Sequence, residues 1–175
     1  CFDENSLNSL PFEVLCPAFD AYFDGKCFAA TIEVWENEFM VTFETGLSLE
    51  ERYSELSSAE LIMTGLFACR NEKKHLSVGD EFCELGMFVI NCVSEYCTLT
   101  TVSSGKKGLF TFSKGETISR EITTTENEPE LTIIRMKIDQ QLFGKLKFTS
   151  EGLIEKASVI NERLPDFKLT VIDRL

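Results

Sequence analysis

The segment SVGDEFCELGMFVINCVS, residues 77–94, has the clearest pattern of a binding site. Its apolar second half predicts a helix. Backbone N–H groups at the start of such a helix bind phosphate when glycines precede it. Here Asp80, Glu81 and Glu84 occupy that loop, and Gly86 is the only glycine left between them and the helix. Two like charges about 5 Å apart cost about 3 kcal/mol at an effective dielectric constant of about 20, so these acids oppose a phosphate. The alternative is that they are N-terminal helix acids favoured by the dipole, or that they bind a metal at a new site.

A second group of acids lies near the N-terminus, in SLPFEVLCPAFDAYFD, residues 9–24. Apolar residues recur there with a helical period, and Glu13, Pro17 and Asp20 share the opposite stripe. A proline inside a helix removes an N–H donor and clashes with the carbonyl four residues back, at a cost of about 3 kcal/mol. The sequence therefore predicts either a helix kinked at Pro17 or one that starts near Cys16.

Nucleophilic and metal-dependent chemistry have little support. The chain has 7 cysteines, an odd number with scattered spacing and no CxxC pair. Its 1 histidine, His75, lies in a polar, lysine-rich loop. We expect reduced, mostly buried cysteines in a cytoplasmic protein, no metal site and no histidine-dependent catalytic unit.

Composition limits the partners. The chain of 175 residues suits a single domain, 1–175. Its 17 Lys and Arg against 29 Asp and Glu give a net charge of -12. Such a surface repels nucleic acids and anionic membranes. No apolar run reaches the roughly 18 residues of a membrane span, and no signal peptide is visible. We therefore expect no direct nucleic-acid binding and no membrane association.

The elements that must position these acids follow from periodicity. We expect helices over 9–24, over 84–94 and over 149–163, and another after the capping box that runs from Ser57 to Glu60. Runs rich in β-branched and aromatic residues predict strands at 29–37, 38–45, 98–104, 108–114, 116–124, 131–139 and 167–173. This order favours an α+β fold, a two-layer sandwich with helices on one face of a mixed, mostly antiparallel sheet.

The order and several segments resemble the N-terminal ATPase domain of the DNA gyrase B subunit, the GHKL (Bergerat) fold of type II topoisomerases. The resemblance covers about residues 10–175 and is clearest in FEVLCPAFDAYFDGKC, SSAELIMTGLFA, GMFVINCVSEYCTLTT and FTSEGLIEKASVINERLPDFKLTVID. The transducer domain that follows in the family is absent from this sequence.

The resemblance implies roles for individual residues. In the family, the first helix carries a Glu general base, an Asn that binds Mg²⁺ and an Asp at i, i+4 and i+7. Glu13 matches the base and Asp20 the Asp, but Pro17 replaces the Asn and offers no metal ligand. Glu13 is therefore the candidate general base of an active domain. The alternative for Glu13 is a solvated acid on a helix face.

Other positions match the nucleotide pocket of the family. Glu44 stands where an Asp accepts a hydrogen bond from adenine, with Gly46 on the following glycine. Thr132 matches a threonine near the adenine and Gly86 the last glycine of the phosphate loop. Thr132 can equally be an ordinary strand threonine.

Three interpretations follow. In the first, this is a degenerate domain that no longer binds or hydrolyses ATP, needs no cofactor and acts as an interaction or scaffold module, with a protein partner or as a homodimer. In the second, it is a functional ATPase domain of a divergent type II topoisomerase that uses ATP and Mg²⁺. In the third, the similarity carries no functional meaning. The losses at Pro17, Glu44 and the acidic loop favour the first. An open cleft lined by Glu13, Glu44 and Gly86 would favour the second, and a cleft filled by side chains such as Phe43, Leu47, Phe82 or Met87 would favour the first.

Overall fold

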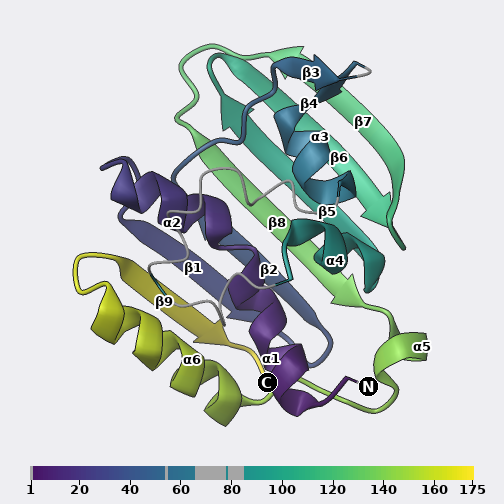
Figure 1. The fold of residues 1–175 in the computed structure, drawn as a ribbon, viewed down its shortest axis with the longest axis vertical. Coiled ribbons are helices and arrows are strands. Elements are labelled where there is room, and N and C mark those ends of the chain that lie inside the picture. Colours follow the sequence, from purple (N-terminus) through teal and green to yellow (C-terminus); the bar gives the residue numbers. More distant parts are fainter. Residues whose placement is uncertain (1, 54, 66–77, 79–84) are drawn as a thin grey trace.

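The computed structural model describes residues 2–53, 55–65, 78 and 85–175. A seven-stranded sheet runs through it in the order β7-β6-β5-β8-β2-β1-β9 (Figure 1). The strands of this sheet are β1 (Ala29–Val34), β2 (Glu38–Phe43), β5 (Ser94–Ser103), β6 (Lys106–Ser113), β7 (Glu116–Thr124), β8 (Leu131–Ile138) and β9 (Lys168–Asp173). A separate hairpin consists of β3 (Glu51–Tyr53) and β4 (Leu56–Ser57). The helices are α1 (Glu4–Glu13), α2 (Cys16–Phe23), α3 (Ser58–Thr64), α4 (Met87–Cys92), α5 (Gln140–Phe143) and α6 (Ser150–Arg163).

The large sheet is mixed, as the sequence predicts. β9 pairs with β1 in parallel, and all other neighbours in the sheet are antiparallel. Two tight turns join β5 to β6 and β6 to β7, with positive φ at Ser104 and Gly105 and again at Lys114 and Gly115. Positive φ at both central residues suits the right-handed twist of a hairpin.

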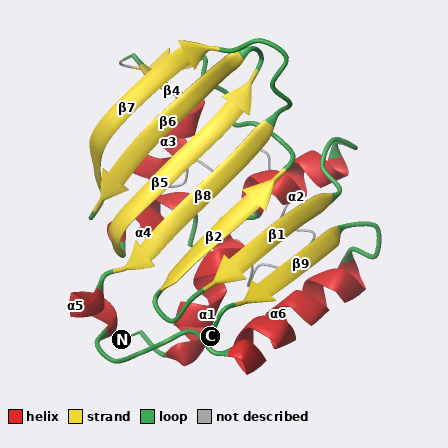
Figure 2. Ribbon diagram, turned by 180° about the vertical axis from the view of Figure 1, so that it is seen from behind, coloured by secondary structure: helices red, strands yellow, loops and turns green. Residues whose placement is uncertain are grey.

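One face of the sheet is covered by α1, α2, α3, α4 and α6, while none of the helices in the described residues lies on the other face (Figures 1 and 2). Phe12 and Phe19 from the helices pack into one core with alternate strand residues such as Phe39 and Ile134, all of them fully buried. The predicted α+β sandwich is therefore confirmed. The strands predicted at 116–124 and 131–139 match β7 and β8 almost residue for residue.

The single helix predicted over 9–24 is wrong. The chain forms two helices, because Pro17 has no N–H to donate to the carbonyl of Glu13. The thiol of Cys16 donates to that carbonyl instead, at 3.1 Å. Pro17 lies in the first turn of α2, where a missing N–H costs nothing. The predicted start near Cys16 is thus confirmed for the second helix.

Other helices begin or end at residues that differ from the predicted ones. α1 begins earlier than predicted, where the Asp3 carboxylate caps the backbone N–H of Ser6 at 2.7 Å. The Ser57 capping box is confirmed. Within the described residues, the helix predicted over 84–94 is the shorter α4. The brief α5 and the β3–β4 hairpin have no counterpart in the prediction.

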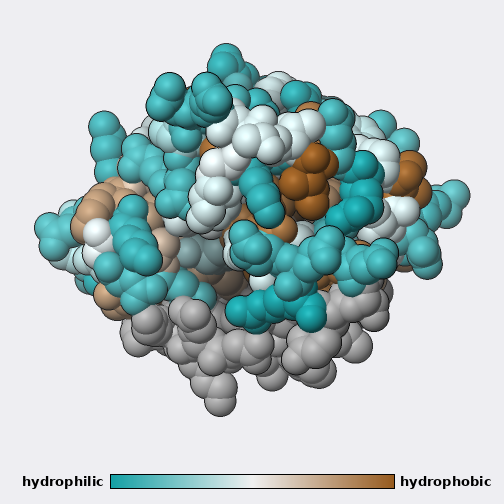
Figure 3. Space-filling view, turned by 90° about the horizontal axis from the view of Figure 1, so that it is seen from above, coloured by the Kyte–Doolittle hydropathy of each residue, from teal (hydrophilic) through white to brown (hydrophobic). Residues whose placement is uncertain are grey.

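None of the helices in the described ranges is long and apolar enough to cross a membrane. Seen from the β3–β4 end, hydrophilic side chains cover much of the visible surface, and hydrophobic ones show in separate groups (Figure 3).

Candidate functional site

The candidate general base, Glu13, ends α1 and is 1% exposed. Its Oε2 accepts hydrogen bonds from the backbone N–H groups of Leu85, at 3.2 Å, and Gly86, at 3.4 Å. Gly86 is the N-cap of α4 and has φ 80, a conformation that favours glycine. The sequence does not predict this contact, which joins two of the candidate residues.

The carboxylate of Glu13 therefore occupies backbone donors at the start of α4. Donors at a helix start attract negative charge, and a carboxylate satisfies them as a phosphate oxygen would. A well-formed hydrogen bond to a charged acceptor contributes about 1.5–3 kcal/mol, and these two bonds, at 3.2 and 3.4 Å, are long and contribute less. An anionic ligand would have to displace Glu13 to reach these two N–H groups. Asp80, Glu81 and Glu84 lie outside the described residues.

The break between α1 and α2 separates the residues that match the first helix of the family. Glu13 lies on α1, whereas Pro17 and the half-buried Asp20 lie on α2. The i, i+7 relation of Glu13 and Asp20 is thus no longer that of one continuous helix. Across the residues that the structure describes, no group of three or more His, Cys, Asp and Glu side chains could hold a metal ion.

The segment after β2 carries the candidate adenine residues. Glu44 is exposed, directly after the end of the strand. Gly46 lies against β5, where an added Cβ would come within 1.9 Å of the Val102 carbonyl oxygen. Only glycine fits this approach, so Gly46 has a structural explanation that needs no ligand.

Thr132 holds the same segment from β8. Its buried hydroxyl donates to the carbonyl of Thr45 at 2.6 Å and lies 3.0 Å from the hydroxyl of Thr101. Thr101 in turn accepts from the backbone N–H of Leu47 at 2.8 Å. The Thr132 hydroxyl thus donates its single proton to Thr45 and has none left to donate to a ligand. Thr101 was not predicted, since a threonine on a strand gives no local signal.

Apolar side chains expected to close a degenerate cleft are buried in the core. Phe43, Leu47 and Met87 are at most 5% exposed. Phe82, the fourth of them, lies outside the described residues.

The described cysteines have the character of core residues. Cys16, Cys27, Cys92 and Cys97 are free thiols. Burial raises the pKa of Cys97 to about 12, and burial also raises the pKa of Cys27, which lies next to Glu44. Such thiols stay protonated at neutral pH and are poor nucleophiles.

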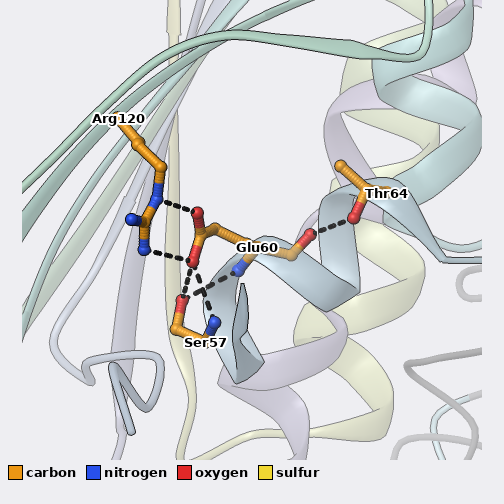
Figure 4. Close-up of polar contacts among 4 residues, drawn as sticks. All are labelled: Ser57, Glu60, Thr64 and Arg120. Carbon is orange, nitrogen blue, oxygen red and sulfur yellow. Dashed lines mark hydrogen bonds and ion pairs between the residues drawn. The ribbon is translucent and has the colours of Figure 1, made fainter. Parts of the chain in front are cut away.

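Glu60, predicted as part of a helix capping box, also forms a partly buried contact with a second element. Glu60 on α3 is fully buried and binds Arg120 on β7, with distances of 2.5 Å to Nε and 3.2 Å to Nη2 (Figure 4). The same carboxylate accepts from the N–H and hydroxyl of Ser57, both at 2.8 Å. Burial by itself raises the pKa of Glu60, but the bonds from Arg120 and Ser57 outweigh it and lower that pKa.

Asn91 makes a comparable connection from α4. Its buried side-chain amide donates to the carbonyl of Met63 on α3 at 3.0 Å and accepts from the N–H of Gly115 at 3.1 Å. Together with Glu60, it fixes the helices that flank residues 66–84 against the β6–β7 hairpin. These contacts shape the surroundings of the candidate site.

The fold is that of the GHKL-type ATPase domain of gyrase B, to which the chain is similar. Among solved structures, the chain resembles the 43K ATPase domain of Thermus thermophilus gyrase B, crystallised in complex with an aminocoumarin, with a TM-score of 0.76 and 21% identity over 97% of this chain and 43% of that one. The predicted GHKL fold is confirmed.

In sequence, the chain is similar to the B subunits of two bacterial DNA topoisomerase 4 enzymes. It is 26% identical to the Rickettsia felis protein over 165 residues, 89% of this chain and 24% of that protein. It is 29% identical to the Caulobacter vibrioides protein over 150 residues, 82% of this chain and 21% of that protein. The chain thus spans about a quarter or less of these relatives. No protein-family model matches it.

Proposed function

We propose that this domain keeps the gyrase B-like ATPase fold without binding or hydrolysing ATP, and that it acts as an interaction or scaffold module. The observation that carries the proposal is the contact of Glu13 with the N–H groups of Leu85 and Gly86. A negative side chain takes the backbone donors that a phosphate would need.

The residues at the pocket fit Mg²⁺-ATP poorly. Pro17 supplies no ligand at the position that binds the metal in the family. Asp80, Glu81 and Glu84 add negative charge to the phosphate loop in the sequence. A carboxylate buried like that of Glu13 must stay hydrogen-bonded, because an unpaired buried charge costs several kcal/mol. Displacing it would therefore take up much of the binding energy of a nucleotide.

One observation supports the alternative, a functional ATPase domain of a divergent type II topoisomerase. Thr132 on β8 donates to the carbonyl of Thr45, directly before Gly46, so two residues that match the family's adenine pocket lie close together. In that case ATP and Mg²⁺ are the cofactors, Glu13 is the general base, and Glu44 accepts from adenine. Glu13 would first have to release Leu85 and Gly86.

Thermal denaturation with a non-hydrolysable ATP analogue and Mg²⁺ separates the two. We expect the melting temperature to stay within error of that measured with Mg²⁺ alone or with the analogue alone. A ligand at about 100 times its Kd would stabilise the fold by about 2.7 kcal/mol and raise the melting temperature by several degrees. An increase of that size would overturn the proposal. If it occurs, Glu13→Ala tests the alternative, because this variant should keep binding and lose hydrolysis.

A further inference from the structure

One edge of the large sheet is an open strand. β7 pairs with β6 on one side, and no strand in the described part of the chain pairs with its other side (Figures 1 and 2). Eight of its nine residues are exposed and Ile122 is half-buried. Ile118 is 63% exposed. An unpaired edge of this length offers backbone donors and acceptors to another chain.

The second half of β7 is shaped for pairing. β7 has a bulge at Ile118, the extra residue opposite Thr111 and Phe112 of β6, but from Ser119 to Thr124 its ladder with β6 is regular. The N–H of Thr125 donates to Gly105 at 2.9 Å, and bonded pairs alternate in an antiparallel ladder. The N–H and C=O groups of residues 120, 122 and 124 therefore point outward. This half of the strand has no proline and no lysine, two residue types that commonly block edge pairing.

The charge at this edge is negative. Among the described residues, Glu116 and Glu121 form no ion pair, while Arg120 is neutralised by Glu60. Glu51 and Glu55 of the β3–β4 hairpin add negative potential at Arg120 and help raise its pKa, after the larger effect of Glu60. With a net charge of -12, a second copy of the chain would be repelled. A basic partner would be attracted.

The helix-free side of this edge can hold a long basic side chain. A shallow hollow of about 330 Å³ lies over β5, β6 and β7. Its side chains include hydroxyls of Thr98, Thr111 and Ser119, together with Leu109 and Glu121. Leu109 is 41% exposed and lies directly opposite Glu121. A lysine or arginine that lies opposite Glu121 on an added strand can place its charged end against that carboxylate.

We propose that the outer edge of β7 binds an extended, basic peptide segment of a protein partner as an added strand. The partner supplies backbone groups to residues 120, 122 and 124 and a Lys or Arg opposite Glu121. This proposal deepens the interaction role proposed above and rests on it. It does not depend on how the domain treats nucleotides.

The test is binding of the peptide acetyl-KTKVKTKV-amide to the ¹⁵N-labelled protein, followed by amide chemical shifts. We expect a Kd in the micromolar range, with the largest shifts and the strongest slowing of hydrogen exchange at the outward amides of β7. Glu121→Lys should weaken binding about 5- to 10-fold. Glu155→Lys, the same charge change at an exposed position of α6, should weaken it less than 2-fold. The glutamate analogue, acetyl-ETEVETEV-amide, should not bind.

Three outcomes would overturn the proposal. These are the absence of shifts in β7, equal losses in Glu121→Lys and Glu155→Lys, and self-association through β7 without peptide, which would assign the edge to a second copy. Titration of the same sample with Mg²⁺ and the ATP analogue reports separately on the proposed loss of nucleotide binding. Failure of one proposal is thus visible without failure of the other.

Discussion

Replacing Arg120 by methionine should destabilise the fold measurably, although the residue lies at the sheet edge. Arg120→Met leaves the carboxylate of Glu60, which is fully buried, with only the two bonds from Ser57. Removing one partner of a buried ion pair costs about 3–5 kcal/mol. The Arg120 side chain is 46% exposed, so water can reach part of the gap, and we expect a loss of about 2 kcal/mol. For 175 residues this corresponds to a melting temperature lower by about 4–8 °C.

Arg135→Met is a matched control. Arg135 is 44% exposed and lies 2.5 Å from Glu38, but Glu38 is 17% exposed and keeps a hydrogen bond from Tyr96. This variant also loses the contact of Arg135 with the ring of Trp35. We expect a cost of about 1 kcal/mol. Urea denaturation at neutral pH compares the two variants. Equal losses of unfolding free energy in the two variants would show that the burial of Glu60 does not determine the cost of removing its arginine.

The pH dependence gives an independent readout. The pKa of Glu60 in the folded protein lies below its ordinary value of 4.5, so its contribution to stability is present above that pH. The contribution is lost as the pH falls through the lower folded value. Wild type should therefore lose more stability than Arg120→Met between neutral pH and about pH 3. If the stability of wild type and of Arg120→Met falls in parallel over this range, the pH dependence does not come from the Glu60–Arg120 pair.

Three further predictions concern the segment after β2 and the thiols. Gly46→Ala should destabilise by about 2–3 kcal/mol in urea denaturation, because its Cβ would lie 1.9 Å from the Val102 carbonyl; an unchanged midpoint would contradict the observed approach. Thr132→Val keeps the shape but leaves the partly buried carbonyl of Thr45 without this donor, and should cost about 1–2 kcal/mol by the same assay. Cys92, which is half-buried, should react with a thiol reagent before the fully buried Cys97, as mapped by mass spectrometry; the reverse order would be inconsistent with a pKa of about 12 for Cys97.

The sheet was predictable because its signals are local. Runs rich in β-branched residues between turn signals placed β7 and β8, and the reciprocal bonds of Ser57 and Glu60 lie within one helical turn. The break between α1 and α2 was foreseen only as one of two options. A proline excludes one helical hydrogen bond, but the packing around it decides whether the helix bends or restarts.

The site was less predictable because its contacts join distant parts of the chain. Glu13 and Leu85 are 72 residues apart, and Glu60 and Arg120 are 60 apart. No periodicity marks such pairs. The sequence indicated the chemistry of Glu13 and Gly86, but only the fold shows that each is the hydrogen-bond partner of the other.

The amide resonances of Leu85 and Gly86 test the central claim most directly. Both should keep their chemical shifts when Mg²⁺ and a non-hydrolysable ATP analogue are added at millimolar concentration, because the Glu13 carboxylate already holds these N–H groups. Saturable shifts of both resonances, with a midpoint that follows the analogue and not Mg²⁺ alone, would show that nucleotide replaces Glu13 and would contradict this account.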